Sequence, residues 1–491
     1  MSRTPSPSRS RVTRPVVCAA VDCGATSGRV IVGRWSRGRL ELTEVHRFPN
    51  AFRSLGGRYT WDMAGIWEQI RLGLAEAVRR FPGLGSVGVD FWGVDHALLD
   101  ARGRLVYPVH AYRDARTEPG RRRLERSGLA AVYRETGIPN LFYNTSLQLE
   151  ESLRTHPGLR SVVRRCLLLP DYVNFLLSGR MVSEVSIAST TQLLSVKGLR
   201  FSPAALRRFG VPASWFPRIR RAGVVFGLVR GIPGLERVRV VGVPGHDTAC
   251  AFASMPASGD GADLYLSSGT WSLVGCESTT PLLGAEALAA GITNERMGDG
   301  RFAPQMSFAG LWLLERTLQD FGLHFSGEAA WDEFLGEVSR GPAPAARIDV
   351  RSPLLANPPS MRRALDRLVR DAGARPPRDA AGYARLVFAS LGAAHGDALR
   401  RFEALSGRVF RRILMTGGGA RNRLLCQATA DHADVPVHAI AGEGTAAGNL
   451  AYQLVALGAV DSIADFRRLW LKHCPPVVYR PSTNRMAQSN P

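Results

Sequence analysis

The residues of this 491-residue chain best suited to chemistry are one aspartate and two glycine-rich turns. The first turn, Gly24-Ala25-Thr26-Ser27-Gly28, follows a short apolar run, and the second, at 266–272, contains Thr270. Main-chain N–H groups and hydroxyls in such turns are free to hold phosphate oxygens. Asp247 lies between the two turns in the sequence. Two phosphate turns with a carboxylate between them predict phosphoryl transfer across a cleft.

Asp22 and Asp247 have different expected roles in that chemistry. A carboxylate beside the first turn repels phosphate unless a cation lies between them, so we expect Asp22 to hold Mg²⁺ through water. Asp247 follows a predicted buried strand, where open α/β sheets place ligands, and it is the expected base for a hydroxyl proton. Structural alternatives remain open, with Asp22 capping its turn and Asp247 capping a helix that starts near residue 248.

A third glycine-rich segment suits a nucleotide. Gly417, Gly418 and Gly419 stand between a predicted strand and a predicted helix, where glycines let a flat ring or a phosphate approach the main chain. Asn422 either contacts the nucleotide or caps that helix. There is no G-x-x-x-x-G-K-[ST] motif, and the G-x-G-x-x-G at 83–88 follows a helical stretch and precedes a strand. That order is the reverse of a dinucleotide-binding unit, so we interpret it as a helix-to-strand connection.

The first part of the chain also contains side chains suited to a polyhydroxylated ligand. They are found near Gly93, which follows Trp92, and in the run Tyr112-Arg113-Asp114. Charged side chains can hydrogen-bond sugar hydroxyls while an aromatic plane covers the apolar ring face. A surface ion-pair cluster is the alternative interpretation of this run.

The predicted elements repeat one pattern in two parts of the chain. In the first part, hydrophobic periodicity predicts strands over 16–22, 29–35, 39–47, 86–91, 96–99 and 238–243, and helices over 61–80 and 171–177. In the second part, it predicts strands over 263–266, 272–275 and 412–416, and helices over 311–318, 383–405 and 421–431. The strand–turn–strand unit recurs, so we expect an α/β fold of two related domains.

The expected division is a basic, disordered leader over 1–14, an N-terminal domain over 15–257, a C-terminal domain over 258–480 and a polar tail over 481–491. The leader is rich in Ser, Pro and Arg and lacks the apolar stretch of a secretory signal. No run approaches the roughly 18 apolar residues that span a bilayer. Seven scattered cysteines without C-x-x-C spacing indicate reduced thiols in a cytoplasm, and a zinc site is not expected.

The formal net charge of +21 does not by itself predict nucleic-acid binding. Lys197 and Lys472 are the only lysines, so the charge comes almost entirely from arginines that are spread along the chain. No zinc-finger or RNA-recognition signature accompanies them. The expected partners are small anionic substrates, without nucleic acid or membrane.

The order of motifs along the chain resembles the FGGY carbohydrate kinases. It runs D-x-G-x-x-S-G-R, W-G-V-D, Y-R-D-x-R, G-H-D-T-A, L-S-S-G-T-W-S, G-L-W-L-L-E-R and G-G-G-x-x-N, and the resemblance covers about residues 16–480. It implies two actin-like, ribonuclease H-like domains that close over a sugar and ATP. It also implies transfer of the γ-phosphoryl group of MgATP to O1 of L-rhamnulose, the substrate of the branch that L-S-S-G-T-W-S and 292–295 most resemble. The sugar comes from the resemblance alone.

The resemblance also implies roles for individual residues. Asp247 would be the base, and Gly93, His246 and Thr248 would lie with it at the sugar. The ATP contacts would be Gly24, Ala25, Thr26, Ser27, Gly28, Thr270, Ser307, Glu315, Gly417, Gly418, Gly419 and Asn422.

Four departures from the family pattern leave alternatives open. Phe91 stands where the family usually has Thr before Trp-Gly, Ser307 ends a Met-Ser pair in place of Lys-Asn, Glu315 replaces Gln, and 442–449 is shorter and changed. The first favours a kinase for another ketose or polyol, such as L-fuculose. The other three favour a sugar-binding regulator with weakened ATP binding. In each case the protein is expected to be a cytoplasmic monomer or small homo-oligomer.

Overall fold

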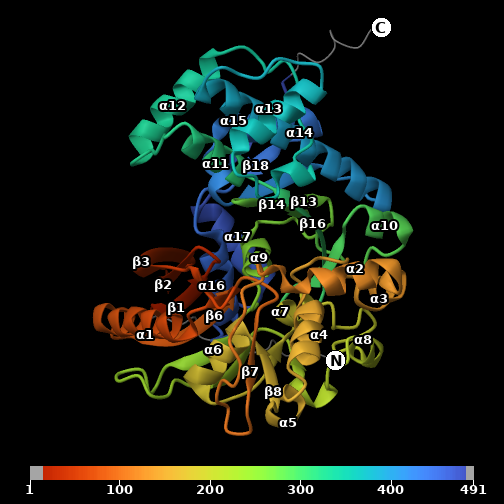
Figure 1. The fold of residues 1–491 in the computed structure, drawn as a ribbon. Helices are drawn as coiled ribbons and strands as arrows, with labels where there is room; N and C mark the ends of the chain where they lie inside the picture. Colours follow the sequence, from red (N-terminus) through yellow and green to blue (C-terminus); the bar gives the residue numbers. More distant parts are fainter. Residues whose placement is uncertain (1–14, 483–491) are drawn as a thin grey trace, which may run out of the picture.

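Two mixed β-sheets, one from each half of the chain, form the frame of the molecule (Figure 1). The computed structural model describes residues 15–482, so the predicted leader over 1–14 and residues 483–491 of the predicted tail lie outside the described residues. The first sheet has the order β11 (Val224–Leu228), β12 (Arg239–Gly242), β6 (Leu84–Phe91), β1 (Val16–Cys23), β2 (Ser27–Ser36), β3 (Arg39–Pro49). The second has the order β15 (Thr293–Arg296), β16 (Phe302–Ala309), β14 (Trp271–Gly275), β13 (Asp263–Ser268), β17 (Arg412–Thr416), β18 (Val437–Ala439), β19 (Val477–Tyr479).

The two sheets share one topology. In each, three antiparallel strands in sequence order are followed by two strands that pair in parallel on the other side of the first strand. Strand β1 corresponds to β13, β2 to β14, β3 to β16, β6 to β17 and β12 to β18. The hairpins β1–β2 and β13–β14 carry the two glycine-rich turns at equivalent places. The predicted repeat of a strand–turn–strand unit in an α/β fold is therefore confirmed.

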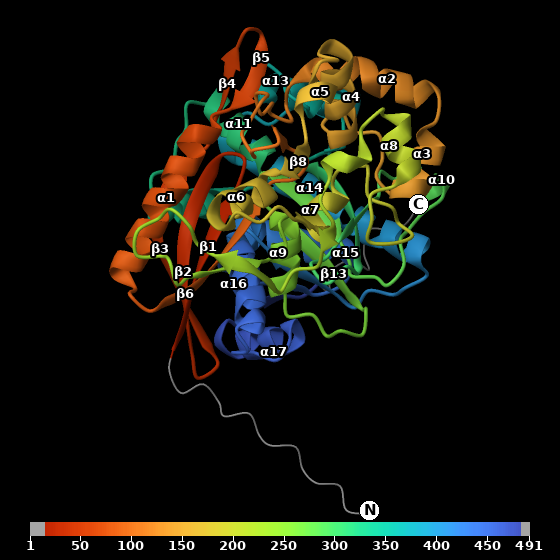
Figure 2. The same ribbon diagram turned by 90° about the horizontal axis from the view of Figure 1, so that it is seen from below.

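The first sheet is covered on both faces because side chains on successive strand positions point in opposite directions. Ala19 and Val21 of β1 pack toward α1 (Met63–Arg80) and α6 (Leu169–Ser178). Cys18 and Ala20 pack toward α16 (Gly444–Ala456) and α17 (Ile463–His473), which come from the C-terminal half. Helices α16 and α9 (Asp247–Ser254) lie between the two sheets, as Figure 2 shows.

The other face of the second sheet is covered by long helices. Helix α14 (Ala380–Ser406) packs against α15 (Arg423–Ala433), and further helices complete this layer: α11 (Trp312–Asp320), α12 (Glu328–Arg340), α13 (Met361–Asp371). The N-terminal half also contains small elements around its sheet: β4 (Phe52–Leu55), β5 (Arg58–Trp61), β7 (His96–Leu99), α2 (Glu118–Arg126), α3 (Leu129–Thr136), α4 (Thr145–Thr155), α5 (Leu159–Val162), β8 (Arg165–Leu168), β9 (Ser183–Glu184), α7 (Val185–Ser189), α8 (Pro203–Arg208), β10 (Ile219–Arg220). Helix α10 (Ala285–Ala289) lies before β15.

Capping side chains explain where the observed helices differ from the predicted ones. The helix predicted over 61–80 begins at Met63 because Asp62 accepts a hydrogen bond from the Gly65 N–H. The helix predicted over 421–431 begins at Arg423, since Asn422 accepts hydrogen bonds from the N–H groups of the next turn. The G-x-G-x-x-G segment connects α1 to β6, as predicted.

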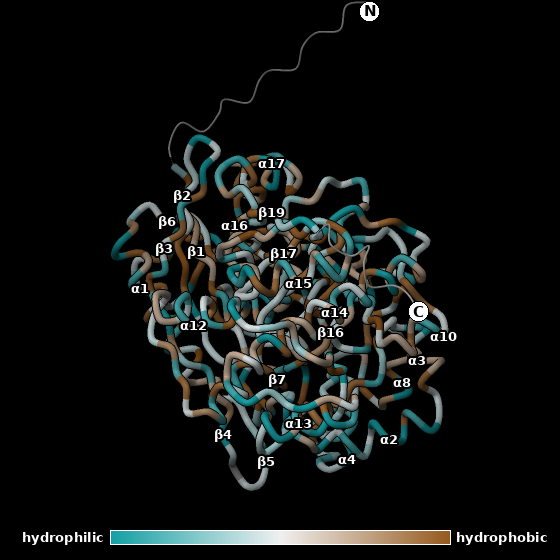
Figure 3. Tube along the Cα trace, turned by 90° about the horizontal axis from the view of Figure 1, so that it is seen from above, coloured by the Kyte–Doolittle hydropathy of each residue, from teal (hydrophilic) through white to brown (hydrophobic). Residues whose placement is uncertain are grey.

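Hydropathy along the chain follows this layering. In Figure 3 the strand β1 is hydrophobic, whereas the peripheral helix α2 is strongly hydrophilic. Within residues 15–482, no helix combines the length and apolar character that a bilayer crossing requires.

The approach of α9 to α16 is unusually close. A β-carbon added at Gly448 of α16 would lie 1.8 Å from the main-chain oxygen of Cys250 in α9. The next residue, Asn449, donates a 2.6 Å hydrogen bond to the buried Asp90 carboxylate of β6. The C-terminal helix α16 therefore fixes α9, and with it Asp247, against the first sheet.

We expect Gly448→Ala to lower the midpoint of thermal unfolding by several degrees, because the added methyl group forces two packed helices apart at a cost of about 3 kcal/mol. Gly336→Ala in α12 is the matched control, since its added methyl group meets no atom within 4 Å. The control should be neutral or slightly stabilising. Equal melting temperatures for wild type and Gly448→Ala, measured by circular dichroism, would contradict this packing.

Candidate active site

A cavity of about 380 Å³ lies where the two halves meet, and residues from both line it. The N-terminal half contributes Gly24, Ala25, Thr26, Trp92, Gly93, Tyr112, Arg113, Thr190, His246, Asp247 and Thr248. The C-terminal half contributes Ser267, Gly269, Thr270, Trp271, Leu273, Thr293, Glu295, Gln305, Ser307 and Thr445. The structure therefore brings together the predicted base, both predicted phosphate turns and the predicted sugar residues.

Asp247 is the first residue of α9 and opens into this cavity. Its side chain is 30% exposed, and its Oδ1 accepts hydrogen bonds from the main-chain N–H of Thr248 at 2.6 Å and from the Thr248 hydroxyl at 3.2 Å. Burial raises the pKa of Asp247 above its ordinary value, and the opposing effects of His246 and the Thr248 donors only partly offset this shift. The residue before the helix is His246, which makes no capping bond through its side chain. Asp247 thus presents an acceptor to the cavity instead of occupying the N-cap position.

The loop that carries Asp247 is held by a buried glutamate. Glu184 accepts hydrogen bonds from the Gly245 N–H at 2.9 Å and from both the N–H and the hydroxyl of Ser186. The Ser186 hydroxyl in turn accepts from the His246 N–H at 3.2 Å. Burial raises the pKa of Glu184 to about 7 despite these donors. Glu184 is a positioning residue for this loop, and nothing in its local sequence indicated that role.

His246 forms an ion pair across the cavity. Its Nδ1 lies 2.8 Å from the Glu295 carboxylate of β15, and its Nε2 lies 3.4 Å from Asp247 Oδ1. Burial alone would lower the pKa of His246, but the Glu295 and Asp247 carboxylates raise it to about 9. Gly93 lies beside this imidazole, because a β-carbon added there would be 3.5 Å from His246 Nε2.

The cavity wall around Trp92 depends on one buried carboxylate. Asp95 Oδ2 accepts hydrogen bonds from the indole N–H groups of Trp61 at 2.7 Å and Trp92 at 2.9 Å, and from the Tyr112 N–H at 3.2 Å. Its Oδ1 accepts from the Gln148 amide at 3.0 Å. Burial raises the pKa of Asp95 to about 6, and the four donors act against that shift. Asp95 belongs to the W-G-V-D motif, yet its anchoring role depends on partners distant in sequence.

Part of the first glycine-rich turn lines the cavity. Gly24, Ala25 and Thr26 do so, and the buried Asn50 holds the turn through its side-chain amide to the Gly24 carbonyl and its N–H to the Thr26 carbonyl. Ser27 and Gly28 instead belong to β2, and a β-carbon at Gly28 would collide with the Phe48 ring. Of the five predicted phosphate contacts in this turn, three are placed at the cavity.

Asp22 lies behind the first turn in an ion pair with Arg29. The Arg29 Nη2 donates to Asp22 Oδ2 at 2.6 Å, and its Nη1 donates to Glu443, which comes from the C-terminal half. Burial raises the pKa of Asp22, Arg29 lowers it, and the Asp247 carboxylate raises it again. The two carboxylates therefore repel each other at the same junction, which is an environment that favours a cation.

A neighbouring cavity of about 310 Å³ contains the third glycine-rich segment. It is lined by Arg29, Thr416, Gly417, Gly418, Arg421 and Glu443, and it shares Ala251, Ser267 and Thr445 with the main cavity. Gly418 is exposed there, whereas Gly417 has a positive φ of 86° and Gly419 packs on Ser268. Of the three glycines, only Gly418 has open space at its β-carbon position. A β-carbon at Gly417 or Gly419 would collide with Ser268 of strand β13.

Three further positions lie away from their expected places, and Asn422 takes the second of its two expected roles. Phe91 has no exposed surface and packs in the core of the first sheet, so it does not line the sugar cavity. Ser307 lines the cavity that contains Asp247 instead of the one lined by Gly417. Glu315 is on the exposed side of α11 and lines none of the cavities described above, and Asn422 is the buried cap of α15.

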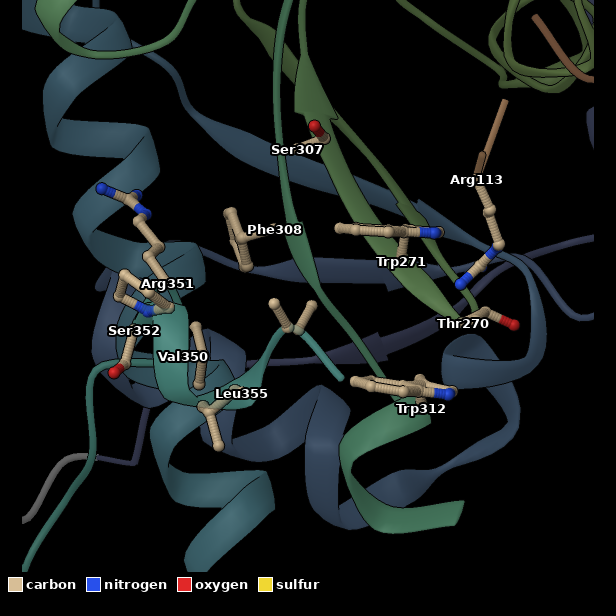
Figure 4. A pocket seen from close by; sticks show the side chains of 13 residues that line it. Arg113, Thr270, Trp271, Ser307, Phe308, Trp312, Val350, Arg351, Ser352 and Leu355 are labelled. Carbon is tan, nitrogen blue, oxygen red and sulfur yellow. The ribbon is translucent and has the colours of Figure 1, made fainter. Parts of the chain in front are cut away.

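An aromatic cavity of about 260 Å³ adjoins the main cavity (Figure 4). Trp271, Trp312 and Phe308 line it, and the Arg351 guanidinium lies 5.3 Å from the Phe308 ring centroid. It shares Arg113, Thr270, Trp271 and Ser307 with the main cavity, and Figure 4 shows the Arg113 side chain extending toward Thr270. Ligand roles were predicted from the sequence for Arg113, Thr270 and Ser307, but not for the aromatic side chains that complete this cavity.

Comparison with known proteins agrees with this geometry. The chain matches the models of the FGGY family of carbohydrate kinases, with the N-terminal domain over residues 17–252 and the C-terminal domain over 264–457. It is 35% identical over 470 residues to a rhamnulokinase of Bacteroides thetaiotaomicron, covering 94% of this chain and 95% of that one. A rhamnulokinase of Klebsiella pneumoniae is 37% identical over 458 residues, covering 92% of each chain.

Solved structures share the fold at low sequence identity. A gluconate kinase from Lactobacillus acidophilus matches with a TM-score of 0.77 and 15% identity, covering 96% of this chain and 94% of that one. Plasmodium falciparum glycerol kinase with ADP matches with a TM-score of 0.77 and 13% identity, covering 95% and 94%. These structures show the fold alone.

Fold, site and relatives together define the class: the chain belongs to the FGGY family of carbohydrate kinases. The predicted fold of two actin-like domains is confirmed. Within that class the protein is an ATP-dependent sugar kinase.

We expect Asp95→Ala to raise the KM for the sugar at least tenfold, because four buried N–H donors lose their acceptor and the Trp92 wall loosens. The KM for ATP should change much less, since no cavity residue of the Gly417 side contacts Asp95. Asp100→Ala, which removes a carboxylate from an exposed turn of the same half, is the control. Steady-state kinetics test this expectation, and an unchanged sugar KM would contradict it.

Proposed function

We propose that this kinase transfers the γ-phosphoryl group of MgATP to O1 of L-rhamnulose and forms L-rhamnulose 1-phosphate. The observation that carries the proposal is the Asp247 carboxylate, which opens into one cavity together with Gly24–Thr26 and Thr270. The choice of L-rhamnulose as the substrate is supported by relatives named rhamnulokinase, whose alignments cover more than 90% of this chain. The proposed domains, 15–257 and 258–480, supply the two walls of the cavity.

The proposed step needs one proton acceptor and one aligned phosphoryl group. As the O1–phosphorus bond forms, the bond between the γ-phosphorus and the bridging oxygen breaks, and ADP leaves with that electron pair. The hydroxyl proton of O1 passes to the Asp247 carboxylate. The His246 cation and the two Thr248 donors lower the pKa of this carboxylate against the larger raising effect of its burial, and so favour the ionised form that can accept a proton.

The other site residues would bind and orient the two substrates. We assign Gly93, His246 and Thr248 to the sugar, with Trp92 supplying an apolar face. Gly24, Ala25, Thr26 and Thr270 would hold phosphate oxygens, and the Gly417–Gly418 side would hold the nucleoside. Ser307 lines the cavity that contains Asp247 and also the adjoining aromatic cavity.

The carboxylates of Asp22 and Asp247, where the two halves meet, suit a magnesium ion that arrives bound to ATP. Within the described residues, no three His, Cys, Asp or Glu side chains gather in a way that could hold a metal. Mg²⁺ is commonly bound by one or two carboxylates, water and substrate phosphates. Because the Asp22 and Asp247 carboxylates repel each other, a cation near Asp22 would relieve that repulsion, and Asp22 is therefore the carboxylate that we assign to Mg²⁺. When bound there, Mg²⁺ would neutralise phosphate charge.

Three residues that favoured other functions, Phe91, Ser307 and Glu315, do not lie where those functions would need them. Phe91 suggested another ketose, but its ring is buried beneath Trp92 and does not contact the cavity. Ser307 and Glu315 suggested weakened ATP binding, but neither lines the cavity of the glycine triplet. The changed segment 442–449 does line that cavity, through Gly442, Glu443, Gly444 and Thr445, so it alone still favours altered ATP binding. L-Rhamnulose therefore remains the proposed acceptor, with MgATP as the donor.

We expect Asp247→Asn to reduce kcat by about 10²–10⁴-fold or more, since the isosteric amide cannot accept the O1 proton. ADP release with MgATP should be measured on L-rhamnulose, L-fuculose, L-xylulose, L-ribulose and glycerol. Rapid turnover of L-rhamnulose by the wild type, with MgATP affinity retained in Asp247→Asn, is the expected result. Faster turnover of another sugar would overturn the substrate, and an active Asp247→Asn would overturn the base.

We expect Asp22→Asn to raise the Mg²⁺ concentration for half-maximal rate by about 10–100-fold, because it removes a negative charge that supports a metal's water ligands. The measurement is a Mg²⁺ titration at fixed ATP. Glu41→Gln, an exposed substitution on β3, is the matched control. Identical Mg²⁺ dependence in all three proteins would exclude this role for Asp22.

A further inference from the structure

One ion pair joins the two halves inside the active site. Glu295 lies on β15 of the second sheet, whereas His246 lies in the loop between β12 and α9. Their side chains are 13% and 12% exposed, and His246 Nδ1 lies 2.8 Å from Glu295 Oε2. The same imidazole places its Nε2 3.4 Å from Asp247 Oδ1. The three groups thus form a chain that starts in the C-terminal half and ends at the proposed base.

The surroundings of Glu295 keep it ionised. Burial would raise the pKa of Glu295, but the His246 charge and hydrogen bonds from Gln305 and Thr293 lower it overall. These two polar neighbours also line the cavity and come from β16 and β15. The carboxylate is therefore a fixed negative charge at this wall.

The surroundings of His246 keep it protonated. The charged groups that act on it are Glu295 on β15, Asp247 on α9 and Glu184 at the start of α7, and all three are carboxylates. A carboxylate close to Nδ1 restricts the ring orientation of an imidazole and thereby the neighbour that Nε2 faces. Here that neighbour is Asp247.

We propose that Glu295 is a positioning residue for phosphoryl transfer, which acts from the C-terminal half by holding the His246 imidazolium against Asp247. This inference rests on the proposed role of Asp247 as the base. The imidazolium favours the ionised form of the carboxylate and fixes its orientation before the sugar proton is transferred. Because Glu295 and Asp247 come from opposite halves, the base is complete only when both walls of the cavity are in contact.

The sign of the pH dependence follows from this arrangement. Below about pH 9 His246 carries its proton and the chain of three groups is intact. As the pH rises through that value, His246 becomes neutral and kcat falls. The Glu295 carboxylate is the group that raises the pKa of His246 most, and Glu295→Gln removes its charge. The pKa of His246 should therefore fall to about 6.5 or lower, and the decrease in kcat should begin at a lower pH.

The test combines kinetics with a direct titration. The pH dependence of kcat for L-rhamnulose is measured in wild type, Glu295→Gln and Glu295→Asp, and the His246 imidazole is followed by NMR in histidine-labelled protein. Ten histidines are present, so a His246→Gln variant assigns the signal. We expect kcat of Glu295→Gln at pH 9 to be at least about tenfold lower relative to its own maximum than in wild type. Glu295→Asp, which keeps the charge, should recover part of the alkaline range.

The exposed Glu286→Gln on α10 is the matched control and should leave the profile unchanged. A wild-type His246 that titrates near its ordinary value, or an unshifted alkaline limb in Glu295→Gln, would overturn the proposal. A change in sugar KM alone would also overturn it, since it would make Glu295 a simple sugar contact. The NMR titration reports the ion pair whether or not Asp247 is the base, so it separates this inference from the proposed function.

Discussion

The contact between α9 and α16 is the constraint on which the rest of the structure depends. Gly448 lets α16 lie directly on the main chain of α9, and Gln453 donates to the Ala19 carbonyl while accepting from the Ser86 hydroxyl. A helix from the second half of the chain is thereby hydrogen-bonded to the first sheet. Asp247 begins α9, so the position of the base is set by packing that involves both halves.

Electrostatic strain is concentrated at the end of α9 that faces the cavity. Asp22 and Asp90 are register neighbours on adjacent parallel strands, and burial together with the Asp22 charge raises the pKa of Asp90 well above its usual range. Arg29 and His246 are the cations that balance this group of carboxylates. Such a group of buried ionisable side chains lowers the stability of the fold. In return, the site is already arranged to bind metal-bound phosphate and to accept a proton.

Local sequence signals predicted the parts of the site that one segment can build. The two turns, the repeated hairpins and Asp247 at a strand end each follow from a few adjacent residues. Glu184, Asp95 and Glu295 were not assigned roles, because each acts through partners that only the tertiary fold brings near. Phe91 was wrongly expected near the sugar. The alternation along a strand predicts that successive side chains point to opposite faces of the sheet, but it does not predict which face lines the cavity.

The central claim is that Asp247 receives the proton of sugar O1 while the γ-phosphate lies between the two glycine-rich turns. A crystal structure of the ternary complex with L-rhamnulose and a non-hydrolysable ATP analogue tests it most directly. We expect O1 at about 2.6–3.2 Å from an Asp247 oxygen, with the terminal phosphate between Gly24–Thr26 and Thr270. A sugar bound with another hydroxyl at Asp247, or a phosphate held away from both turns, would contradict it.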